Sequence, residues 1–195
     1  VLVRLLFINA LSFGLLMAYL SAAPFVLRNV LGMGTVAYTA VFGLCGATVT
    51  VTIAVAASLV RRFSQARQVR VGLIAGLVVD TVFAGVCLTW LREPVTGPER
   101  MPLLVAVVAL FLAHVACLGL SMGNAPALAL DRTGRWAGTG SALLGFLQFV
   151  IGGLVSPLVG LTGEASGVAF GVVIVAVGAV ANVLAVFGLR ERGEK

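Results

Sequence analysis

Six apolar stretches, separated by short polar segments, fill almost all of this 195-residue chain. Each stretch is close to or longer than the ~20 residues that an α-helix needs to cross ~30 Å of hydrocarbon. A spanning segment must satisfy its own backbone groups in lipid, and the sequence lacks the alternating ~10-residue segments of a membrane β-barrel. We therefore expect one all-α integral membrane domain, 1–195, with spans at about 5–26, 35–60, 71–91, 101–120, 137–161 and 167–189.

The basic residues are divided unevenly between the two sides of the membrane that these spans define. Because six is an even number, both termini lie on the same side. The opposite side carries only Arg28, Arg92 and Arg100 of the 13 basic residues. The positive-inside rule therefore predicts that both termini are cytoplasmic. The basic residues on that side are Arg4, Arg61, Arg62, Arg67, Arg70, Arg132, Arg135, Arg190, Arg192 and Lys195.

The composition argues against several other classes of protein. The chain is 61% hydrophobic and 10% charged, whereas a soluble domain carries roughly 25% charged residues. Its net charge of +6 comes from residues that flank the spans, so we expect no nucleic-acid binding. Cys45, Cys87 and Cys117 are isolated within spans. We therefore expect no disulfide framework, no metal site and no cofactor.

Two ionisable side chains lie within predicted spans. Asp80 is near the middle of the third span, and His114 lies in the fourth at a depth expected to be similar. An ionised Asp there costs ~2.5–3.5 kcal/mol, so Asp80 is expected to be protonated, paired or in contact with an aqueous cavity. One interpretation is a proton-coupling Asp80 that acts with His114. The alternative is structural: a neutral Asp80 bonded to a neighbouring helix and a His114 satisfied by packing.

Polar and aromatic side chains also occur along the first and fifth spans. On one helix face, such residues suit a pocket for an amphipathic small molecule. Ser and Asn equally serve as hydrogen-bonding groups between membrane helices, so both interpretations stay open. The candidate substrate-binding residues are Asn9, Ser12, Phe13, Tyr19, Ser141, Phe146, Gln148 and Phe149.

Four short segments, at residues 21–27, 59–64, 124–130 and 137–149, have a pattern known from one family of transporters. In that order they resemble the end of helix seven, the basic loop after helix eight, the end of helix ten and the start of helix eleven. The family is the Bcr/CflA-type drug–proton antiporters of the major facilitator superfamily. The resemblance covers essentially the whole chain, as the C-terminal six-helix half of a twelve-helix transporter.

The resemblance implies alternating access, in which two six-helix bundles enclose a site near the bilayer midplane. We expect proton-coupled efflux of drugs or small amphipathic metabolites across the bacterial cytoplasmic (inner) membrane. The expected partner is an N-terminal six-helix half, fused upstream or separate. Arg61 and Arg62 are gating-loop candidates, although Arg61 stands where the superfamily motif has Asp. The third helix of each three-helix unit is peripheral in this superfamily. The first, fourth and fifth spans are therefore better candidates for lining a cavity than the third span, which contains Asp80.

Three other functions were weighed against this one. A six-helix half-transporter that forms homodimers needs self-complementary cavity faces. A structural or truncated six-helix membrane subunit needs no transport of its own. An intramembrane serine protease would use Ser141 and His114, but in such enzymes the nucleophile precedes the His, and a His-Glu-x-x-His metal motif is absent. We therefore expect no enzymatic activity.

Overall fold

The computed structural model describes residues 2–163 and 166–188, and every regular element in that part of the chain is helical. Six of its helices are long and apolar enough to cross a membrane, which confirms the predicted fold class of a multi-pass all-α membrane protein. The elements are α1 (Leu2–Pro24), continued by the π-helical η1 (Phe25–Val30), α2 (Thr35–Leu59), α3 (Gln65–Thr89), α4 (Arg100–Leu130), the short 3₁₀ element η2 (Gly134–Trp136), α5 (Ala137–Leu158) and α6 (Val168–Gly188).

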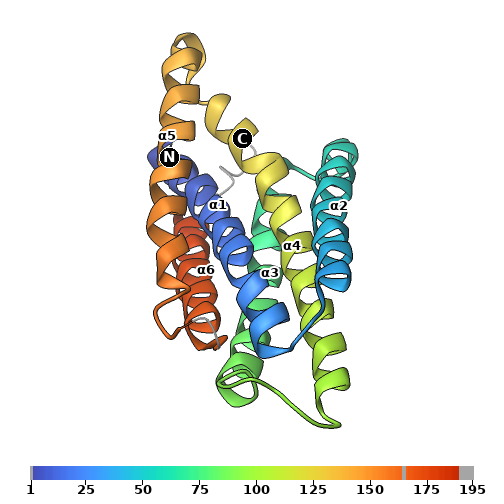
Figure 1. The fold of residues 1–195 in the computed structure, drawn as a ribbon. Coiled ribbons are helices and arrows are strands. Elements are labelled where there is room, and N and C mark those ends of the chain that lie inside the picture. The colour runs from blue at the N-terminus through green and yellow to red at the C-terminus, as the bar shows by residue number, and fades with distance from the viewer. Residues whose placement is uncertain (1, 164–165, 189–195) are drawn as a thin grey trace.

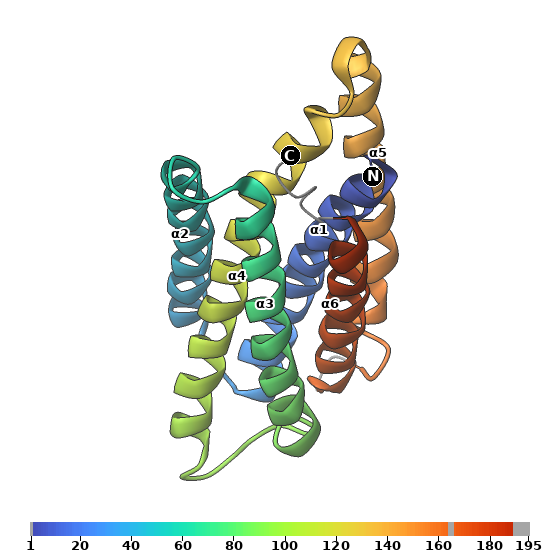
Figure 2. The ribbon, with the colours of Figure 1, turned by 180° about the vertical axis from the view of Figure 1, so that it is seen from behind.

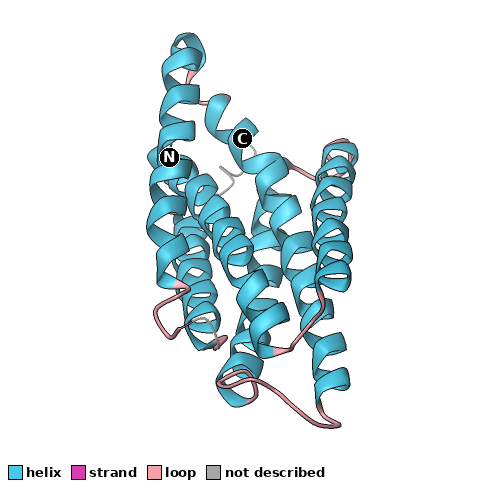
Figure 3. Cartoon of the chain, in the orientation of Figure 1, coloured by secondary structure: helices cyan, strands magenta, loops and turns pink. Residues whose placement is uncertain are grey.

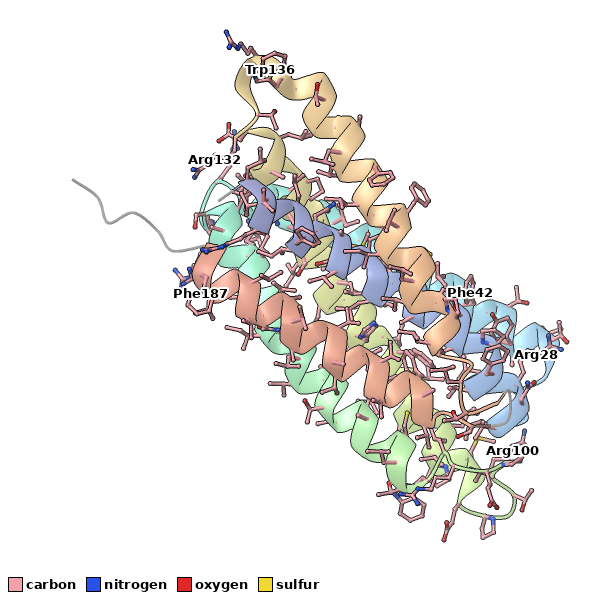
Figure 4. All side chains as sticks on the ribbon, turned by 90° about the vertical axis from the view of Figure 1, so that its left-hand side faces the viewer. Arg28, Phe42, Arg100, Arg132, Trp136 and Phe187 are labelled. Atoms are coloured by element: carbon pink, nitrogen blue, oxygen red, sulfur yellow. The ribbon has the colours of Figure 1, made fainter. Side chains whose placement is uncertain are left out.

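Successive helices run in opposite directions (Figure 1). The start of α1 and the α2–α3 and α4–α5 connections lie at one end, which we name the arginine-rich end, and the other three connections lie at the opposite end (Figure 3). Figure 4 labels Arg132 at the arginine-rich end and both Arg28 and Arg100 at the opposite end. The bundle thus places these arginines at opposite ends, and which end is cytoplasmic stays a prediction. Arg190, Arg192 and Lys195 lie outside the described residues.

Helix α1 is the most buried of the six, and α2 and α5 are the most exposed. In the most apolar part of the span Leu2–Val30, which comprises α1 and η1, 61% of the residues are buried. The corresponding share is 11% in α2 and 11% in the span Gly134–Leu158, which comprises η2 and α5. The reason is that α1 packs against α4, α5 and α6, whereas α2 packs mainly against α4, and α5 mainly against α1. From behind, α1 is visible between α3 and α6 (Figure 2). Consequently α2 and α5 each leave a broad face without a protein neighbour in the described structure.

Buried aromatic rings fill the core between α1, α3, α4 and α6. The ring of Phe111 lies 4.8 Å from that of Phe83, 5.4 Å from that of Tyr19 and 5.7 Å from that of Phe170, measured between centroids. The edge-to-face pairs of Phe111 with Phe83 and with Tyr19 are favoured by the quadrupoles of the rings. Lipid provides little hydrophobic force between membrane helices, so such close van der Waals packing stabilises the bundle.

Helices α1 and α5 approach closely at Gly152. A Cβ atom on this residue would lie 2.8 Å from Met17 Cγ and 3.1 Å from the Phe13 ring. Only glycine therefore fits without displacing a neighbour. One turn further along, the hydroxyl oxygens of Ser21 and Ser156 lie 2.6 Å apart and join the same two helices.

Two helices extend beyond the spans expected from the sequence. Helix α4 continues to Leu130 rather than ending near residue 120, and α3 begins at Gln65 rather than at residue 71. Pro126 lies inside α4. Proline removes one backbone hydrogen bond of the helix, and in a membrane bundle neighbouring groups can satisfy the carbonyl oxygen that loses its partner. At the start of α3, the Ser64 hydroxyl accepts a hydrogen bond from the backbone N–H of Arg67 at 3.3 Å and caps the helix.

At the opposite end, Arg100 holds the α1–α2 connection against the start of α4. Its Nε donates to the carbonyl oxygen of Leu31 at 2.7 Å, and its Nη2 donates to that of Gly32 at 2.5 Å. Gly32 has a φ of 59°, a left-handed conformation that suits glycine. Charged donors make stronger hydrogen bonds than neutral ones, so these two bonds join the α1–α2 connection strongly to α4.

Candidate functional site

Asp80 of α3 and His114 of α4 form a pair inside the bundle. Asp80 Oδ1 lies 2.5 Å from His114 Nδ1, and each side chain is only 1% exposed. The sequence predicted similar depths for these residues, and the structure brings them into direct contact. Whether the pair binds a transported proton stays a prediction.

The surroundings of this pair restrict its charge. An unpaired carboxylate is costly at this depth, but a carboxylate beside an imidazolium, or a carboxylic acid beside a neutral imidazole, is neutral overall. Both states contain a hydrogen bond between the two residues. Adding or removing one proton would leave a net charge in a buried site.

A cavity of about 10 Å³ adjoins the pair. Its walls come mainly from α3 and α4, with Leu15 contributed by α1 and Gly178 by α6. The pair therefore lies among four helices and away from the exposed faces of α2 and α5. Whether the third span lines a substrate cavity stays a prediction.

Four of the eight candidate substrate-binding residues come together between α1 and α5. The Phe13 and Phe149 rings meet edge to face with centroids 5.4 Å apart, and Gln148 Nε2 donates to Asn9 Oδ1 at 3.5 Å. Phe149 is 71% exposed, and Phe146 on the same helix is 63% exposed. The α5 face thus combines exposed aromatic rings with an amide pair at its edge.

The other candidates lie apart from this group. Ser12 is buried and its hydroxyl donates to the carbonyl oxygen of Ile8 within α1. Tyr19 is buried in the aromatic core, where it also stacks on Phe42. Ser141 is exposed near the start of α5, toward the arginine-rich end. The eight residues therefore do not form one pocket in this chain, and Ser12 and Tyr19 have structural contacts of their own.

The gating-loop candidates Arg61 and Arg62 are exposed in the connection between α2 and α3. This connection lies at the arginine-rich end (Figure 1). Among the described residues, no group of three or more His, Cys, Asp or Glu side chains is arranged to hold a metal ion.

A comparison with known proteins supports a transporter relationship. Over 176 residues, the chain is 29% identical to a Bacillus subtilis (strain 168) protein named "Uncharacterized MFS-type transporter YdgK". The chain is similar to an MFS-type transporter. The match covers 88% of this chain but only 40% of that relative, so the chain spans less than half of the relative's length. No family model matches the chain, and no solved structure matches it.

Sequence reasoning missed three buried polar residues that accompany the Asp80–His114 pair. Gln68 of α3 and Asn124 and Ser121 of α4 are each at most 5% exposed. Asn124 Nδ2 donates to Gln68 Oε1 at 3.3 Å, which joins the two helices nearer the arginine-rich end. The spacing is a usable signal, because residues 68, 72, 76 and 80 recur every fourth position and so share one face of α3.

Proposed function

We propose that this chain is the C-terminal half of a proton-coupled secondary transporter of the major facilitator type. The similarity to an MFS-type transporter over 40% of its length supports a half-length bundle. Six apolar helices fit the number of spans in one half of such a transporter. The finer assignment to Bcr/CflA-type drug efflux in the bacterial inner membrane rests on the sequence resemblance.

The observation that carries this proposal is the open surface of α2 and α5. A Cβ atom placed on Gly43 or Gly46 of α2, or on Gly145 or Gly153 of α5, would meet nothing within 4 Å. Small residues on membrane helices are typical of faces that another helix approaches closely. The two most exposed helices therefore offer surfaces suited to a second bundle. We infer that an N-terminal six-helix half, fused or separate, covers them and completes the cavity.

Within this arrangement, the α5 face supplies part of the substrate site. Exposed Phe146 and Phe149 offer aromatic surface, and the half-buried Gln148 beside them offers an amide that is bonded to the buried Asn9. Such a mixture suits a small amphipathic molecule. We assign proton binding to Asp80 and His114, because both are ionisable side chains buried together inside the bundle.

Efflux from cells that produce the transporter tests this function. We expect the natural polypeptide to lower the accumulation of a fluorescent lipophilic cation such as ethidium, and an uncoupler that collapses the proton gradient to abolish that difference. Phe149→Ala should weaken efflux, whereas the control Phe187→Ala, on an exposed position of α6, should retain it. Equal loss in both variants would contradict the assignment of the α5 face.

The size of the polypeptide tests the half-transporter proposal separately. An antibody against residues 189–195 should detect a band near twice the 20.0 kDa of this chain, or a 20.0 kDa band that co-purifies with a second six-helix protein. A 20.0 kDa band with neither a partner nor efflux would favour the alternative, a structural or truncated membrane subunit.

A further inference from the structure

A seam of small and polar residues runs between α3 and α4, from the Asp80–His114 pair toward the arginine-rich end. At four-residue intervals, α3 contributes Gln68, Gly72, Gly76 and Asp80. The facing residues of α4 are His114, Cys117, Ser121 and Asn124, as the contacts between the helices establish: a Cβ on Gly72 would lie 2.8 Å from Ser121 Oγ, and one on Gly76 would lie 3.5 Å from Cys117 Cβ. Gly72 lets the two helices approach closely, whereas a side-chain methyl group at Gly76 would fit at ordinary contact distance.

Two polar atoms in this seam have no hydrogen-bond partner among the described residues. They are His114 Nε2 and Ser121 Oγ, and each side chain is 1% exposed. Most buried polar atoms in proteins have a partner, and a buried group without one costs ~1–3 kcal/mol. Both residues line the cavity of about 10 Å³, together with Gly72 and Gly76. This volume is close to the roughly 10–15 Å³ that a cavity needs to hold one water molecule.

We propose that one water molecule binds in this cavity, with His114 Nε2 and Ser121 Oγ as its hydrogen-bonding partners. The chemistry favours water over a metal cation. A hard cation prefers several oxygen ligands, whereas the walls here add mainly a thiol, glycines and leucines to one hydroxyl and the paired carboxyl. Water can donate to or accept from the imidazole in either of its neutral tautomers.

The bound water gives His114 a partner for proton exchange. In both neutral forms of the pair, Nε2 carries a hydrogen and donates it to the water. Transfer of a proton from Nε2 to this water forms a hydronium ion, and its return restores the pair. The other titratable groups that line the cavity are Asp80 and Cys117, since α1 and α6 contribute only Leu15 and Gly178. The polar seam continues to Gln68 and Asn124 toward the arginine-rich end. Exchange of a transported proton at the pair rests on the proposed proton-coupled function, but the water site does not.

The presence of a single histidine makes the water site directly observable. In the chain labelled with ¹⁵N only at histidine and reconstituted in lipid nanodiscs, every imidazole nitrogen signal comes from His114. We expect a magnetisation-transfer cross-peak between water and the His114 ring. Absence of this cross-peak from the unmodified chain overturns the proposal, whatever the result of the efflux assay.

Two variants distinguish a water in this cavity from general solvent access. Gly76→Ala places a methyl group at ordinary contact distance from Cys117, and Gly178→Ala places one 3.4 Å from Asp80 Oδ2 from the α6 side. Either should remove or strongly weaken the cross-peak. The control Gly85→Ala, on α3 with nothing within 4 Å, should leave it unchanged. A cross-peak of full intensity in both folded cavity variants places the water elsewhere and overturns the proposal.

Discussion

Replacing Asp80 and His114 by alanine, singly and together, measures how strongly the buried pair stabilises the bundle. The contact of 2.5 Å and the 1% exposure of each side chain mean that each single variant leaves the other residue buried without its partner. Removing one member of a buried charged pair costs ~3–5 kcal/mol, and leaving a neutral polar group unpaired costs ~1–3 kcal/mol. We therefore expect ~3 kcal/mol of destabilisation from either single variant.

The double variant should cost little more than one single variant, because it removes the group that the first substitution left unpaired. The expected coupling energy is thus about 2 kcal/mol or more, well above the ~0.5 kcal/mol within which independent sites add. Reversible unfolding in mixed micelles with increasing SDS provides the four free energies of unfolding. Thr81→Ala, on the exposed side of the same turn, is the control and should change the unfolding free energy little. Additive effects of the two single substitutions would refute the claim that the contact stabilises the fold.

Three further predictions concern packing, the Arg100 tie and orientation. Gly152→Ala should destabilise the chain by ~1–3 kcal/mol through overpacking against α1, whereas Gly153→Ala, with nothing within 4 Å, should not; thermal unfolding in detergent compares them. Arg100→Gln should lower the unfolding free energy by ~1–3 kcal/mol, measured in the same way, because two backbone carbonyls lose a charged donor. In a chain whose native cysteines are replaced by alanine, Arg62→Cys should react with a membrane-impermeant maleimide only from the cytoplasmic side and Thr96→Cys only from the other side; the reverse pattern would contradict the predicted orientation.

Properties that depend on segment length and polarity could be predicted from the sequence. Six apolar runs of sufficient length require six spanning helices in lipid, and the structure has them. Counting residues along two adjacent antiparallel spans also indicated that Asp80 and His114 lie at similar depths, because the helical rise is constant. Their contact follows from that placement together with the packing of α3 on α4.

Properties that depend on how each helix is rotated could not be predicted in the same way. Ser12 and Phe13 are neighbours in sequence but point about 100° apart around α1, so one is buried and the other reaches Phe149 on α5. The fourth apolar span was expected to end near residue 120, whereas α4 continues to Leu130. In the bundle, the buried Asn124 and its bond to Gln68 hold that segment of α4 against α3.

The tie made by Arg100 limits how the bundle can move. Since one guanidinium holds the carbonyl oxygens of Leu31 and Gly32, the end of the first helical segment, the start of α2 and the start of α4 are linked at a single point. A rocking motion at this end must carry these three helices as one rigid unit or break both bonds at once. Helix α5 is outside this link, but its close contact with α1 at Gly152 and the Ser21–Ser156 bond couple it to the same unit.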